Sequence, residues 1–77
     1  MDDVVVSYTI NSDSIVSDRR IVTARAILEA AGFTPAELYV LRRVSPPEDF
    51  HGRYDALVSV GEHDEFHALY IGPTYSA

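Results

Sequence analysis

The sequence contains neither cysteine nor lysine, and each absence excludes a kind of chemistry. Without cysteine the chain can form no disulfide, no thiolate nucleophile and no cysteine-ligated zinc site. Small secreted domains commonly depend on disulfides, so the absence of cysteine favours a reducing compartment. All six basic residues are arginine, so no side chain carries an amine.

The chain also lacks long apolar runs and an excess of positive charge. No run approaches the roughly 20 apolar residues that span a bilayer, and the start Met1-Asp2-Asp3 is acidic where a signal peptide would be basic. The formal net charge is −6, which disfavours binding to nucleic acid or anionic membranes because their phosphates would repel it. We therefore expect a soluble, cytoplasmic protein that binds neither.

The residues that are present suit one small folded domain. The chain has 77 residues, of which 47% are hydrophobic, enough for one core and no second domain. Alternation predicts a first strand over residues 4–10, whose apolar face carries Val4, Val6, Tyr8 and Ile10. Turn-forming residues 11–14 and a short extended run at 15–17 complete a predicted β-hairpin.

A helix is predicted over residues 24–31. Thr23 is a suitable N-cap, because its hydroxyl can accept from a free amide of the first turn. Gly32 is a suitable left-handed stop. One apolar stripe follows the helical spacing and contains Ala24, Ile27, Leu28 and Ala31. Arg25 and Glu29 lie four residues apart on the outer face, where they can pair.

The second half predicts strands separated by polar segments. Thr34-Pro35-Ala36-Glu37 has the pattern of a capped helical turn. Residues 38–44 form a predicted strand with Tyr39 and Leu41 inward, and two prolines make residues 45–52 a loop. Further strands are predicted at residues 57–60 and 66–71.

The predicted order is therefore ββαβββ. An amphipathic helix buries its stripe against the nearest apolar sheet face. We expect an α+β fold of the β-grasp (ubiquitin-like) kind, with a mixed sheet of four to five strands packed on one helix. This domain is assigned to residues 1–72, and residues 73–77 are a predicted C-terminal tail.

The helix and the strand after it resemble a known family. The run "IVTARAILEAAGF" from Ile21 to Phe33, continuing as "TPAELYVL" to Leu41, is similar to the bacterial multiubiquitin family. Its members carry a threonine-alanine-arginine helix start, an "ILEAAG" helix end and a short acidic turn into "YVL". The segment Tyr8-Thr9-Ile10-Asn11 also resembles that family's first strand. The similarity covers most of residues 4–44.

The resemblance implies a ubiquitin-like protein modifier. In such systems a ubiquitin-activating-like enzyme, a ubiquitin-conjugating-like enzyme and a processing peptidase act on the modifier, and antiviral defence is one setting. This chain does not end in a glycine pair as ubiquitin does, so Gly72 becomes the candidate conjugation residue after removal of residues 73–77. Two alternatives stay open: Gly72-Pro73 only ends the last strand, or Ala77 itself is activated.

The absence of lysine fits the modifier hypothesis in one respect. A modifier without lysine cannot build isopeptide chains on its own side chains. A genome that favours arginine codons explains the same composition, so both interpretations stay open.

A second hypothesis is a docking module that is never conjugated. In a β-grasp sheet the helix covers one face and leaves the other to partners. Outward residues of two strands would then form an apolar patch edged by charge, made of Val40, Arg42, Val44, Leu69 and Ile71. An ordinary solvated sheet face is the alternative. A sulfur carrier would need the terminal glycine pair and is disfavoured.

No catalytic or metal site is predicted. His63 and His67 lie four apart, but Asp64 follows the first histidine where zinc proteases have glutamate. The four glycines are scattered, so no phosphate-binding loop exists, and no serine lies on a strand-to-helix turn. We expect a protein that is not an enzyme and needs no cofactor.

Overall fold

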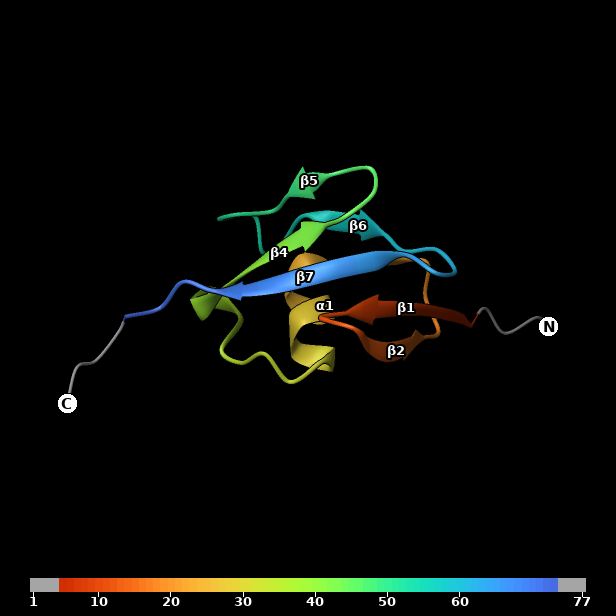
Figure 1. The fold of residues 1–77 in the computed structure, drawn as a ribbon, viewed down its shortest axis with the longest axis horizontal. Coiled ribbons are helices and arrows are strands. Elements are labelled where there is room, and N and C mark those ends of the chain that lie inside the picture. The colour runs from red at the N-terminus through yellow and green to blue at the C-terminus, as the bar shows by residue number, and fades with distance from the viewer. Residues whose placement is uncertain (1–4, 74–77) are drawn as a thin grey trace.

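The protein is described here from a computed structural model, which covers residues 5–73 of the chain. Val4 and residues 74–77 of the predicted tail lie outside the described residues. In chain order the elements are β1 (Val6–Ile10), β2 (Asp13–Ser17), β3 (Ile21–Thr23), α1 (Ala24–Ala30), the 3₁₀ turn η1 (Ala36–Leu38), β4 (Tyr39–Arg43), β5 (Glu48–Asp49), β6 (Leu57–Ser59) and β7 (Glu65–Tyr70) (Figure 1).

Five of the strands form one mixed sheet, in the order β2-β1-β7-β4-β5. The β1–β7 pair is parallel, and the other three pairs are antiparallel. The single helix α1 contributes Ile27 and Leu28 to the core on one side of this sheet. The predicted α+β class is confirmed, and the arrangement is similar in outline to a β-grasp. Over residues 5–73 no helix is long and apolar enough to cross a membrane.

The strands differ from the prediction at three places. Residues Ile21–Thr23, just before the helix, form the strand β3, which the sequence did not predict. The predicted strand at residues 57–60 exists as β6, but it pairs with β3 in a separate two-stranded sheet. The predicted loop at residues 45–52 contains the short strand β5. Its residues come after both prolines, and they bring Asp49 opposite Arg42 and Glu48 opposite Arg43. Opposite charges on neighbouring strands favour such pairing.

The helix begins and ends as the sequence predicts. The hydroxyl of Thr23 accepts from the Ala26 amide at 3.0 Å. After the helix, Gly32 adopts a φ of 88°. The amides of Gly32 and Phe33 donate to the carbonyls of Glu29 (3.0 Å) and Leu28 (2.9 Å), a Schellman motif. The predicted N-cap of the next turn, Thr34, is wrong. The turn η1 begins after Pro35, and no side chain caps it.

The core joins the predicted faces of β1, α1 and β4. Tyr8 is 2% exposed, and its ring meets that of Phe66 edge-on with centroids 5.5 Å apart. Leu41 is fully buried, which confirms the inward side chosen for β4. Each large apolar side chain buried in this way stabilises the fold by about 1.5–3 kcal/mol.

Arg43 is the second of two successive arginines in β4, so these two side chains point to opposite faces of the sheet. It lies on the core side, with its guanidinium 5.3 Å from the ring centroid of Phe66. From there it donates to the carbonyl of Ser59 and pairs with Glu48 at 3.7 Å. Its stem covers the edge of the core while its charge reaches β6. Arg43 therefore links the five-stranded sheet to the two-stranded one.

The turn between β1 and β2 holds a second link between distant segments. Asn11 and Ser12 have φ values of 51° and 72°, as a type I′ hairpin turn requires. The Asn11 side chain donates to the Ala68 carbonyl at 3.1 Å and accepts from the Ala68 amide at 3.0 Å. The side-chain amide of Asn11 therefore bonds to β7 as a backbone amide of β1 would. It does so at the point where the chain turns away from β7 towards β2.

We predict that Asn11→Ala destabilises the fold by about 1–3 kcal/mol, because it leaves the part-buried Ala68 amide without a partner and replaces asparagine, which adopts positive φ comparatively readily, by alanine, which does so less readily. Asn11→Gly loses the same two hydrogen bonds but tolerates the backbone conformation. Urea denaturation should therefore rank the wild type above Asn11→Gly and Asn11→Gly above Asn11→Ala. Equal stability of Asn11→Ala and the wild type would show that this link contributes nothing.

Candidate functional site

The sheet face opposite α1 carries the residues expected to contact a partner. Successive strand residues point to opposite faces, and Leu41 points into the core, so Val40 and Arg42 point away from it. Across the ladder Val40 pairs with Leu69. Arg42 pairs with His67 in the same way.

The five predicted surface residues differ in accessibility. Leu69 is 40% exposed and Ile71 46%, whereas Val40 is only 5% exposed. Val44, just beyond β4, is 37% exposed. Among these five residues, the accessible apolar atoms therefore come mainly from Leu69 and Ile71 at the end of β7, whereas Val40 is almost fully covered.

Arg42 already has a partner within the chain. Its guanidinium pairs with Asp49 of β5 at 3.1 Å. The same carboxylate accepts from the His51 amide at 2.7 Å. The His51 bond, and after it the Arg42 bond, lowers the pKa of Asp49. A protein that docks on this face would meet an arginine whose charge is partly neutralised.

Gly72 lies in a crowded position just after β7. The Ile71 amide donates to the Leu38 carbonyl at 2.7 Å, and the Tyr70 hydroxyl donates to the Pro73 carbonyl at 2.9 Å. A Cβ at Gly72 would come within 2.6 Å of the Tyr70 hydroxyl oxygen and 2.9 Å of a Leu38 methyl carbon. Close packing therefore gives a structural reason for glycine here, whether or not the residue is ever conjugated.

We predict that Gly72→Ala destabilises the protein by about 1 kcal/mol, the lower range for overpacking, since the atoms it meets are side-chain ends that can move. In a Tyr70→Ala background the same change should cost far less, because the nearest obstacle is gone. A double-mutant cycle by urea denaturation measures this coupling. Equal costs in both backgrounds would contradict the proposed close contact.

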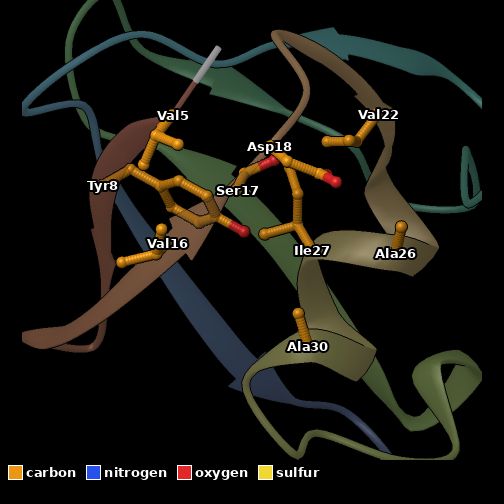
Figure 2. A pocket seen from close by; sticks show the side chains of 9 residues that line it. All are labelled: Val5, Tyr8, Val16, Ser17, Asp18, Val22, Ala26, Ile27 and Ala30. Carbon is orange, nitrogen blue, oxygen red and sulfur yellow. The ribbon is translucent and has the colours of Figure 1, made fainter. Parts of the chain in front are cut away.

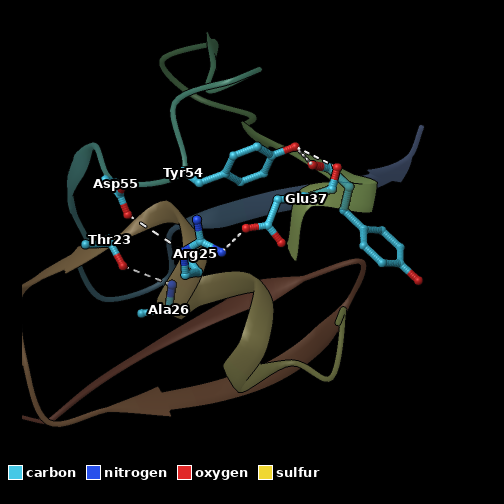
Figure 3. Close-up of polar contacts among 7 residues, drawn as sticks. Thr23, Arg25, Ala26, Glu37, Tyr54 and Asp55 are labelled. Carbon is cyan, nitrogen blue, oxygen red and sulfur yellow. Dashed lines mark hydrogen bonds and ion pairs between the residues drawn. The ribbon is translucent and has the colours of Figure 1, made fainter. Parts of the chain in front are cut away.

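A polar cluster anchors the start of α1 (Figure 3). Arg25 forms an ion pair with Glu37 of η1 and lies 3.7 Å from Asp55. Its guanidinium stands 5.7 Å from the ring centroid of Tyr54, whose hydroxyl donates to the Tyr39 carbonyl at 2.7 Å. The predicted pairing of Arg25 with Glu29 is replaced by these contacts, because the long side chain reaches η1. The cluster therefore joins α1 to η1 and to the segment before β6.

The ion pair predicts a pH dependence. The hydrogen bond from Arg25 lowers the pKa of Glu37 below its ordinary value of 4.5. Stabilisation from this pair is therefore complete above about pH 4.5 and disappears as the pH falls through the lower, folded-state pKa. Glu37→Gln should reduce stability at about pH 7, and this difference should be smaller at about pH 3, where more of the Glu37 carboxyl is protonated.

Urea denaturation of the two proteins at both pH values checks this expectation. Asp49 is present in both proteins, so its protonation changes both free energies of unfolding equally and cancels in their difference. An unchanged difference between wild type and Glu37→Gln at acidic pH would contradict the assignment.

A groove between β2 and α1 was not predicted from the sequence (Figure 2). Its volume is about 370 Å³, and its apolar lining includes Val5, Tyr8, Val16, Ala26, Ile27 and Ala30. Burial raises the pKa of Tyr8, so its hydroxyl stays protonated. The sequence did contain a signal for an apolar surface here. Val5 and Val16 are apolar, although the strand alternation does not place them on the inward face.

His63 and His67 lie next to and on β7. His63 lies in the turn before β7, with a φ of 68°. His67 lies on β7, 3.8 Å from the Glu65 carboxylate. Within residues 5–73 no three potential ligands gather around a common point.

Comparisons of the chain with protein-family models, with curated proteins and with solved structures gave no match. The resemblance to the multiubiquitin family therefore stays a prediction from the sequence. What the structure establishes is the class, a small α+β domain with a mixed five-stranded sheet and one helix.

Proposed function

We propose that this chain is a ubiquitin-like modifier with a β-grasp fold, activated at its C-terminal end and joined to target proteins. Its partners would be a ubiquitin-activating-like enzyme, a ubiquitin-conjugating-like enzyme and a processing peptidase. This part of the proposal, and a role in antiviral defence, rests on the sequence similarity to the multiubiquitin family.

The observation that carries the proposal is the position of β7. This strand lies in the middle of the sheet, parallel to β1, and its carboxyl end leads out of the sheet (Figure 1). Ile71, Gly72 and Pro73 follow the strand. A modifier must present its C-terminal segment to an enzyme while its domain stays folded, and a chain that leaves a central strand at the sheet's end satisfies this requirement.

The exposed apolar residues beside this exit support the same proposal. Leu69, Tyr70 and Ile71 are 40%, 53% and 46% exposed. Exposed apolar side chains next to a reactive tail are suited to binding an enzyme that acts on it, since buried aromatic and apolar anchors dominate binding energies.

A docking module that is never conjugated is the second candidate. The crowding around Gly72 favours it, because packing against Tyr70 and Leu38 explains the glycine without any conjugation. Under this candidate Arg42, Val44, Leu69 and Ile71 would contact the partner, with Val40 beneath them, and the tail would be dispensable.

The two candidates separate in an intact-mass experiment. The full chain is incubated with ATP and with the activating, conjugating and peptidase enzymes encoded beside it. The modifier proposal predicts either loss of the mass of residues 73–77 or an ATP-dependent covalent adduct with another protein. Leu69→Glu should slow this reaction by roughly tenfold, as expected for loss of an apolar anchor.

Leu57→Glu is the matched control. Leu57 is 73% exposed on β6 and lies outside the proposed surface, so this variant should react like the wild type. An unchanged mass, with the enzymes shown to be active on another substrate, would overturn the modifier proposal in favour of the docking module.

A further inference from the structure

The chain that leaves β7 is held against the domain over its first three residues. The Ile71 amide donates to the Leu38 carbonyl at 2.7 Å. Gly72 lies against the end of the Tyr70 side chain, since a Cβ there would come within 2.6 Å of the hydroxyl oxygen and 2.7 Å of the ring carbon that bears it. The same hydroxyl donates to the Pro73 carbonyl at 2.9 Å. The Tyr70 side chain therefore crosses its own main chain and is bonded beyond it.

Two further aromatic rings support the ring of Tyr70. It meets Tyr39 edge-on with centroids 5.5 Å apart, and Tyr39 meets Phe33 in the same way at 5.1 Å. Edge-to-face contacts at this spacing are favourable, and both Tyr39 and Phe33 pack against the core. Tyr70 is 53% exposed, yet its ring is connected to the core and its hydroxyl to the tail.

This arrangement is incompatible with binding of the tail by an enzyme. A protein that binds a peptide segment in extended form places alternate side chains in its own pockets. Here Tyr70 lies across Gly72 and occupies the hydrogen-bonding site of the Pro73 carbonyl. The side chain must swing away before residues 70–73 can enter such a site. Binding is weakened in proportion to the fraction of molecules in the competent conformation.

We propose that Tyr70 is a latch on the tail, which an enzyme must open before it can bind Gly72. In the closed state the hydroxyl bonds to Pro73, and in the open state it bonds to water. One exposed hydrogen bond of this kind changes the population of the open state by roughly two- to tenfold. The latch itself follows from the contacts within the chain, whereas its role in maturation rests on the proposed function.

Processing after Gly72 would also remove the latch. Hydrolysis adds water across the Gly72–Pro73 bond, leaves a carboxylate on Gly72 and releases Pro73 with a free amine. The carbonyl that accepts from Tyr70 departs with Pro73, so the matured chain lacks this hydrogen bond. The Tyr70 side chain therefore distinguishes the full chain from the matured one, and an activating enzyme that contacts this ring would bind the matured chain more readily.

Chymotrypsin tests the latch without any enzyme of the proposed pathway. The aromatic residue before the bond that it cleaves must enter its hydrophobic pocket, so cleavage between Tyr70 and Ile71 requires an open latch. Tyr70→Phe keeps the ring and removes only the hydroxyl. In the native full chain this variant should yield the fragment 1–70 roughly two- to tenfold faster than the wild type, as followed by intact-mass spectra.

Two controls accompany this comparison. Peptides of residues 67–77 with tyrosine or phenylalanine at position 70 give the intrinsic preference of chymotrypsin, by which the rates are divided. Tyr39→Phe removes a hydroxyl from the neighbouring ring and keeps the ring contact, so it should be cleaved after residue 70 like the wild type.

NMR tests the closed state directly. Cross-relaxation between the ring protons of Tyr70 and the α-protons of Gly72 should be strong in the wild type and in Tyr39→Phe, because these groups are in contact. The same signal should be weaker in Tyr70→Phe. Absence of the signal in the wild type, or equal normalised chymotrypsin rates for the wild type and Tyr70→Phe, would overturn the latch.

The processing peptidase tests the role of the latch in maturation. Tyr70→Phe should lose residues 73–77 faster than the wild type by a factor similar to that seen with chymotrypsin. Equal rates would overturn this role. A peptidase that cleaves neither protein, while chymotrypsin and NMR both detect the latch, would refute the proposed processing and leave the latch established.

Discussion

The parallel pairing of β1 with β7 is the constraint on which the rest of the structure depends. It joins the first and last strands of the domain, and it places Ile10 opposite Phe66 in the core. Hydrogen bonds from Thr9 and Asn11, and the Asn11 side chain on Ala68, hold the register. A slip by one residue would turn Phe66 out of the core. The inner and outer faces of β4 follow from this register, and so does the place where the chain leaves the sheet.

Arginine carries out most of the polar linking in this lysine-free chain. Arg25 ties the start of α1 to η1, and Arg43 ties β4 to the carbonyl of Ser59 on β6. A planar guanidinium can form several hydrogen bonds and also stack on an aromatic ring, as Arg43 does on Phe66, which a lysine ammonium does less well. Arg19 and Arg20 differ because nothing in the described chain pairs with them. The same residue type therefore serves the fold at four positions and is left for solvent or a partner at two.

The end of β7 and the groove beside β2 differ in physical character and lie on different elements. At the end of β7, exposed apolar side chains surround a chain exit whose backbone is already bonded to Leu38. At β2, a groove with a mostly apolar lining lies between the hairpin and α1. In the sheet order β1 lies between β2 and β7, so the groove and the chain exit are separate features of the molecule.

Local spacing was enough to predict β1, the helix with Thr23 and Gly32 at its ends, and the inward side of β4, because caps and alternation act over a few residues. Local spacing did not predict contacts between residues that lie far apart in the chain. The sequence showed neither that Ile21–Thr23 would pair with Leu57–Ser59, nor that Arg43 would pass Phe66 to reach Ser59. Gly72 could be singled out from the sequence, but its contact with Tyr70 and Leu38 required the folded chain. The groove beside β2 also depends on the folded chain, because it forms only where the hairpin and the helix pack together.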